Sequence, residues 1–159
     1  MRKLITLVSV AFVLASCSSS EELEWSTSSV TISAVGPLFE GSNTGTFEWS
    51  YDLVEEIDGL DNLEDILNAR LVSIELTPDD VDVLEDVTIQ LAGEKTGMQK
   101  IAFMNADGNV QVAEKQENLA SFFLDNYPTL VADFNLLDDW YDDYNIEAKL
   151  VFLFNVKTN

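Results

Sequence analysis

Residues 146–156, IEAKLVFLFNV, constrain the arrangement of the whole chain. Their centre, residues 150–154, is an unbroken apolar run, and a strand that is apolar on both faces needs cover on both. We therefore expect this strand to be central, opposite a second sheet and under a helix. Lys149 and Lys157 flank the run as charges that oppose aggregation.

Much of the remaining chain alternates between apolar and polar residues, which is typical of half-buried strands. In residues 46–53 the apolar positions are Phe47, Trp49, Tyr51 and Leu53, which predicts an aromatic inner face with Trp49 in the core. Further strands are expected at residues 30–34, 72–77, 87–91, 99–104, 110–112 and 130–136, with a polar turn at 41–45.

Two short helices are expected between the strands. One begins at Asp61, with Glu64 three residues on as in a capping box. The other covers residues 118–126, capped by Asn118 and stopped by Pro128. Short strands, frequent turns and two small helices predict an all-β fold, a β-sandwich of immunoglobulin-like or jelly-roll type. A small closed β-barrel is the alternative.

The N-terminus has the features of an export signal. Arg2 and Lys3 precede an apolar run over residues 4–15, which is shorter than the roughly 20 residues that a spanning helix needs. Residues 14–17, Leu-Ala-Ser-Cys, resemble the lipobox of bacterial lipoproteins at every position. The resemblance implies that residues 1–16 are a cleaved signal peptide and that Cys17 is the acylated first residue of the mature protein. An ordinary secretory signal or a buried N-terminal helix is the alternative.

The residues after Cys17 refine the expected location. Ser18 is not the aspartate that favours inner-membrane retention in enterobacterial lipoproteins, so an outer-membrane location is expected. Residues 18–22, SSSEE, resemble the serine-plus-acidic tether of Bacteroidota-type lipoproteins that are exported to the cell surface. A periplasm-facing orientation is the alternative. We expect residues 17–27 to be the lipidated cysteine with a flexible tether, and residues 28–159 to be a single β-sandwich domain.

The chain is strongly acidic, with 29 Asp and Glu residues against 8 Lys and Arg and a net charge of −21. Loss of Arg2 and Lys3 with the signal would leave six basic residues and a net charge of −23. Nucleic acid is a poor partner for such a body, because phosphate contacts need clustered Lys and Arg. The acidity is best interpreted as a solubility feature.

Missing residue types exclude several chemistries. There is no histidine, so the chain has no Ser-His-Asp triad, Cys-His dyad or histidine base. Cys17 is the only cysteine, so it has no disulfide partner within the chain, and once lipidated it is no metal ligand. Only oxygen-ligated calcium or magnesium remains among the common metal sites.

Residues 138–145 are the best candidate for a ligand site, because they combine carboxylates with aromatic rings. Sugars could stack on the rings while Asp and Asn bind hydroxyl groups, and Asp138, Asp139, Asp142 and Asp143 could hold Ca²⁺. A solvated hairpin whose aromatic rings pack on the edge of the core is the favoured alternative. The eight residues are Asp138, Asp139, Trp140, Tyr141, Asp142, Asp143, Tyr144 and Asn145.

These features predict a lipid-anchored, non-catalytic interaction or accessory module that needs no cofactor. It would meet the membrane through its lipid and would bind a protein partner through a sheet edge or an acidic loop. A glycan-binding lipoprotein using residues 138–145 is the alternative. A hydrolase with two carboxylates is the least favoured reading, because the acidic residues lie on polar phases of strands or in turns.

Overall fold

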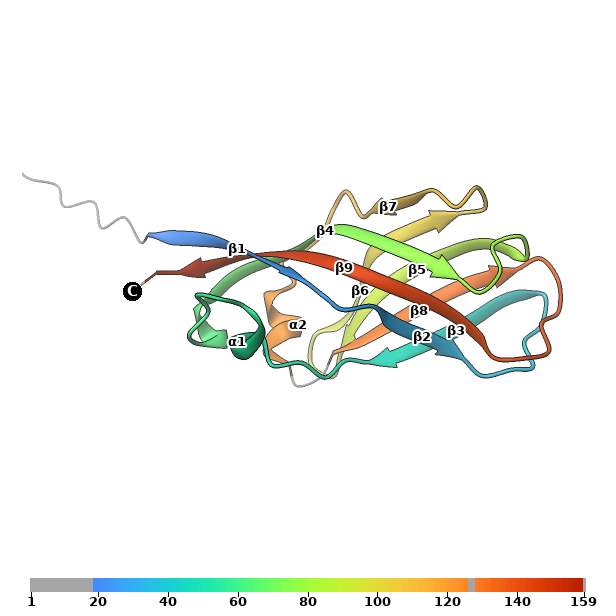
Figure 1. Ribbon diagram of the computed structural model, residues 1–159, viewed down its shortest axis with the longest axis horizontal. Helices are drawn as coiled ribbons and strands as arrows, with labels where there is room; N and C mark the ends of the chain where they lie inside the picture. The colour runs from blue at the N-terminus through green and yellow to red at the C-terminus, as the bar shows by residue number, and fades with distance from the viewer. Residues whose placement is uncertain (1–18, 126–127, 159) are drawn as a thin grey trace, which may run out of the picture.

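The computed structural model describes residues 19–125 and 128–158. It confirms an all-β fold with two short helices, elongated along the strands (Figure 1). No helix within those two ranges has the length and apolar character needed to cross a membrane. The elements are β1 (Ser20–Ser26), β2 (Val30–Ala34), β3 (Gly41–Glu48), α1 (Leu53–Glu56), a 3₁₀ turn (Leu63–Asp65), β4 (Ile66–Pro78), β5 (Leu84–Gly93), β6 (Gly97–Asn105), β7 (Val110–Val112), α2 (Ala120–Leu124), β8 (Thr129–Leu136) and β9 (Tyr144–Lys157).

Strand β9 is central, as expected. One of its edges pairs with β4 over almost its whole length, and the other pairs first with β2 and then with β1. Thr27 joins these two short strands, since its N–H donates to Leu150 O (2.9 Å) and its Oγ1 accepts from Leu150 N (3.0 Å). β9 therefore has partners along both edges.

The strands form one antiparallel sheet that curls into a half-barrel. From β9 the sheet continues through β2, β3, β8, β5, β6 and β7. The curl brings β7 next to β4, but no ladder of backbone hydrogen bonds joins them in the described part of the chain. We call this gap the seam.

Helix α2 fills one end of the half-barrel from inside. Its Phe123 ring lies 5.1 Å from Phe152 and 5.0 Å from Phe154, in a cluster that also contains Trp25 and Trp49. The prediction that Trp49 lies in the core is confirmed, because it is 4% exposed.

The expectation that residues 150–154 are covered on both faces is wrong for one face, although a helix does pack on the other. Leu150, Phe152 and Phe154 point inward and are fully buried, whereas Val151 and Leu153 remain half-buried on the outer face. The helix packs against the inner face because its own aromatic residues bury more surface among the rings there.

The expected flexible tether is wrong for residues 20–26. These residues form β1, which pairs with β9 in register from Ser20 opposite Lys157 to Ser26 opposite Val151. Polar composition suggested a solvated segment, but Trp25 is buried and its indole Nε1 donates to Glu56 (2.9 Å). A strand with one buried aromatic anchor and a complete ladder can tolerate exposed acidic residues at its other positions.

Local signals were also wrong at three places. Residues 41–45 are not a turn but the start of β3, which pairs with β8 from Gly41 onward. The strand expected over 46–53 ends at Glu48, and α1 begins after Asp52, whose carboxylate accepts from Val54 N and Glu55 N. The helix expected from Asp61 is a single 3₁₀ turn, because Ile66 already pairs with β9. Strand pairing overrides a short helical pattern that has little intrinsic stability.

Candidate functional site

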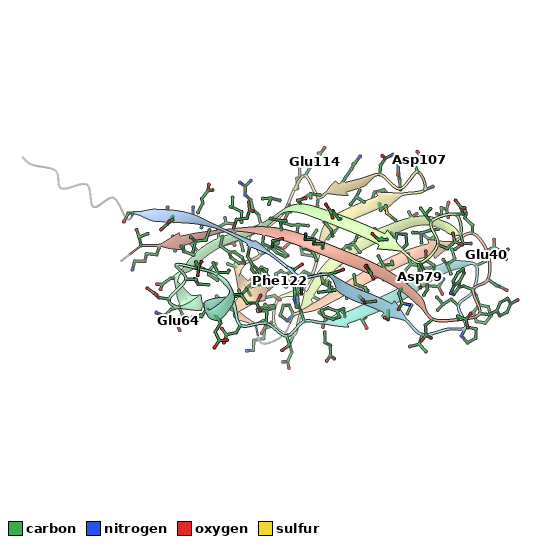
Figure 2. All side chains as sticks on the ribbon, viewed as in Figure 1. Glu40, Glu64, Asp79, Asp107, Glu114 and Phe122 are labelled. Carbon is green, nitrogen blue, oxygen red and sulfur yellow. The ribbon has the colours of Figure 1, made fainter. Side chains whose placement is uncertain are left out.

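Three loops meet at the end of the half-barrel that lies opposite Ser20 and Lys157. They are residues 35–40, 79–83 and 137–143, and we call this region the distal tip. Figure 2 shows Glu40 and Asp79 at this end. Leu38 and Trp140 form a two-way backbone bridge, with Leu38 N donating to Trp140 O (2.7 Å) and Trp140 N to Leu38 O (3.0 Å).

The three aromatic residues of the candidate loop have different environments. Tyr144 is fully buried, stacked on Phe134 with ring centroids 5.3 Å apart, and its hydroxyl donates to Asp80 O. Trp140 is half-buried with its ring edge-on to Tyr144 at 5.4 Å. Tyr141 is 81% exposed. The prediction that Tyr144 offers its ring to a ligand is therefore wrong, because its alternation phase turns it into the core.

Burial also changes the chemistry of Tyr144. It raises the pKa of the phenol to about 12, and the negative charges of Asp80 and Asp79 act in the same direction. The hydroxyl is therefore a fixed donor near neutral pH. Its role is to join the start of β9 to the loop of residues 79–83 within the tip.

Most of the candidate polar residues bind the tip's own backbone. Asp139 accepts from Glu40 N (3.0 Å) and Asp143 from Gly36 N (3.0 Å). Asp138 accepts from Asp139 N, and Asn145 donates through both its backbone and side-chain nitrogens to Asp79 Oδ2. Asp142 is exposed, and its backbone passes so close to Gly36 that a Cβ there would lie 2.2 Å from Asp142 O. The carboxylates mainly cap turns, as in the hairpin alternative.

Calcium binding at Asp138, Asp139, Asp142 and Asp143 stays a prediction. Over residues 19–125 and 128–158, no three acidic side chains converge in a way that could hold a metal ion. Cys17, the expected lipidation site, lies outside the described residues.

The second candidate region was not predicted from the sequence. Two hollows of about 350 Å³ and 380 Å³ lie between β6 and residues 111–122, and Lys100 and Lys115 line both. We call them together the lysine groove. Its apolar lining includes Met98, Phe103 and Val112.

A β-bulge positions Lys100 in this groove. Ile89 pairs with Ala102 and Gln90 with Lys100, so Ile101 is the extra residue of β6. The bulge turns both Ile101 and Ala102 inward and leaves Lys100 on the same outer face as Phe103. The Lys100 Nζ lies 4.6 Å from the centre of the Phe103 ring, a cation–π contact that orients the ammonium group.

The residues that follow the groove are held to β4 across the seam. Gln116 accepts from Leu71 N (2.9 Å) and donates to Leu71 O (2.9 Å), so that its amide acts like one residue of a partner strand. Asn118 does the same with Ala69 N (3.0 Å) and Leu67 O (2.8 Å). These side chains fix residues 113–118 and thereby the wall of the groove that carries Lys115.

The lysines of the groove have no carboxylate partner in the part of the chain that the structure describes. Among the described residues, the ion pair closer than 4 Å is that of Lys95 with Asp125, at 3.7 Å. Glu114 and Glu117 also line the groove, but no described carboxylate lies within that distance of Lys100 or Lys115. No sequence motif signals this arrangement, because it depends on a bulge and on a long-range clasp.

Comparisons with family models, with curated proteins and with solved structures gave no match for this chain.

Proposed function

We propose that this protein is a lipid-anchored, non-catalytic interaction module of the outer membrane that faces the cell surface. The lipobox-like residues 14–17 supply the anchor, and acylation of Cys17 by several chains would be stable, since each buried methylene contributes about 0.8 kcal/mol. A periplasm-facing orientation is the alternative.

The position of β1 is the observation that carries this proposal. Only Ser18 and Ser19 separate Cys17 from Ser20, where the ladder with β9 begins. An acyl anchor on Cys17 would therefore hold the end of the half-barrel that contains Ser20 and Lys157 near the membrane. The distal tip would project away, by roughly 45 Å at about 3.3 Å per residue of the 14-residue β9.

The environment of the carboxylates supports a non-catalytic role. A general acid of a glycosidase needs a carboxyl group in an apolar pocket. Asp125, which is 7% exposed, is the buried carboxylate of the described chain, and it accepts from Lys95 N (2.8 Å) and pairs with the Lys95 ammonium. It holds the β5–β6 turn, so its hydrogen bonds already account for its burial.

Replacement of Cys17 tests the anchor. We expect Cys17→Ser to abolish incorporation of radiolabelled palmitate and to release the protein from membranes. Protease added to intact cells should digest the wild-type protein, whereas a periplasm-facing protein would be digested only after the outer membrane is permeabilised. A Cys17→Ser protein that stays equally membrane-bound would contradict the proposal.

Glycan binding at the distal tip is a second candidate function, favoured by the exposed ring of Tyr141 beside the half-buried Trp140. A glycan array with the wild-type protein, Tyr141→Ala and Trp140→Ala tests it. Binding that is lost in Tyr141→Ala would support this function. The absence of binding, or binding unchanged by either substitution, would refute it.

A further inference from the structure

We propose that the lysine groove binds an extended acidic segment of a partner protein, which adds as a strand to the open edge of β6. This inference rests on the proposed interaction function and specifies where and by what chemistry the partner docks. The open edge, the unpaired lysines and the lining of the groove carry it in turn.

The first argument is the open edge. β5 covers one side of β6 along its length, but β7 covers the other side only from Ala102 to Met104. Ala113 N adds one hydrogen bond to Ile101 O. In the described chain, residues 97–100 have no strand on that side, and the hollow of about 350 Å³ lies beside them. An exposed edge of this kind is a template for an added strand.

The second argument is charge. The mature chain would have six basic residues, and two of them, Lys100 and Lys115, line this groove with no carboxylate within 4 Å in the described residues. Glu114 and Glu117 also line the groove, so its lining is balanced in formal charge, and in a body with 29 acidic residues it opposes an anionic segment less than the rest of the surface does. An incoming strand with carboxylates at alternate positions would place them on one face, toward the lysines.

The third argument distinguishes a peptide from an anionic polysaccharide. The groove offers aliphatic and thioether surface at Val112 and at Met98, which is 57% exposed, and these suit apolar side chains between the acidic ones. Sugar rings stack on open aromatic faces, but the Phe103 ring already carries the Lys100 ammonium group. The observations therefore favour a peptide strand.

The test uses the full chain, extracted from membranes in detergent, and a fluorescein-labelled peptide of alternating Glu and Val residues. Fluorescence anisotropy should show binding that weakens as salt is raised. The double variant Lys100→Gln with Lys115→Gln should weaken it about tenfold, the size expected for two exposed ion pairs. The matched control, Lys149→Gln with Lys157→Gln, removes the same charge from β9 and should change the affinity less than about twofold.

Hydrogen exchange separates strand addition from simple charge attraction. The bound peptide should slow exchange of the amides of residues 97–100 and leave those of the distal tip unchanged. Equal binding of an alternating Lys-Val peptide, equal losses in the two double variants, or no protection at residues 97–100 would each overturn the inference. Binding of polygalacturonate through the same lysines, without the peptide, would assign the groove to a polysaccharide instead. These failures leave palmitate incorporation at Cys17 unaffected, so they are distinguishable from failure of the proposed function.

Discussion

The distal tip and the lysine groove use their charged side chains differently. In the tip, Asp139 and Asp143 accept from backbone N–H groups of a neighbouring loop, and Tyr144 bonds a carbonyl of another. In the groove, Lys100 and Lys115 have no carboxylate partner within 4 Å among the described residues. The tip therefore uses its polar groups to hold its own shape, whereas the groove keeps two charges for another molecule.

The difference shows that charge density is a poor guide to function. Residues 138–145 carry the most conspicuous acidic cluster of the sequence, yet their oxygens largely replace water at turn N–H groups. The groove has only two lysines, but they lie beside an open strand edge. Polar and charged groups that have no partner within the protein are the better indicator of a binding surface.

Among the substitutions that test this difference, Tyr144→Ala should cause the largest loss of stability. The substitution removes a buried ring that packs on Phe134 and Trp140, and the expected loss is about 3–5 kcal/mol in the free energy of unfolding. Urea denaturation measures it. Tyr141→Ala is the matched control and should stay within about 0.5 kcal/mol, because Tyr141 is 81% exposed. Similar effects of the two substitutions would mean that the tip is not held by its buried tyrosine.

Gln116→Ala should have the next largest effect. It leaves Leu71 N–H and C=O without their partners, at a cost of about 1–3 kcal/mol. Gln111→Ala, at an exposed position of β7, should cost far less. Urea denaturation and hydrogen exchange at Leu71 check both changes. An unchanged Leu71 amide in Gln116→Ala would contradict the clasp across the seam.

Tyr144→Phe tests how the stability of the folded state depends on pH through the tip. The pKa of Tyr144 is raised from 10 to about 12, so its stabilising contribution is complete below pH 10 and is lost as the pH rises toward 12. The phenylalanine variant should be less stable by about 1 kcal/mol at pH 8, through loss of one hydrogen bond. Denaturation at a series of pH values should show the gap between the two proteins narrowing from pH 10 to pH 12. A constant gap would mean that the phenol has the same pKa in the folded and the unfolded states.

The class of fold was predictable, because it rests on alternation and on the apolar run of residues 150–154, both of which tertiary packing preserves. The secondary structure of segments that depend on a partner strand was not predictable. The sequence predicted that Ser20–Ser26 belong to a tether and that residues 41–45 form a turn. Both segments are in strands, because β9 pairs with the first and β8 with the second. Propensity is a weak signal against a complete ladder of hydrogen bonds.

The candidate tip residues were recognisable by type, but not by role. Asn145 bonds Asp79, 66 residues earlier, and Asp143 bonds Gly36, 107 residues earlier, and no local pattern reports such contacts. The lysine groove was missed for the same reason, because the bulge at Ile101 and the Gln116 clasp are properties of the assembled sheet.

Asp139→Ala should cost about 0.5–1.5 kcal/mol of stability, through loss of its bond to Glu40 N. The double variant Lys100→Gln with Lys115→Gln should cost no more than about 1 kcal/mol, because it removes the Lys100–Phe103 cation–π contact but no ion pair of the described residues. Thermal denaturation compares the two. A larger loss in the lysine variant would mean that the groove serves the fold.

Calcium should have the smallest effect of all. A cation that binds specifically at 100 times its Kd adds about 2.7 kcal/mol to the stability of the folded state. The tip carboxylates that cap turns have oxygens committed to N–H groups, so we expect Ca²⁺ to raise the melting temperature no more than Mg²⁺ at equal ionic strength, through screening of the acidic surface. Melting curves with calcium, with magnesium and with a chelator measure this. A calcium-specific rise that disappears in a variant with Asp138→Asn and Asp142→Asn would show that the tip, and not only the groove, keeps charge for a ligand.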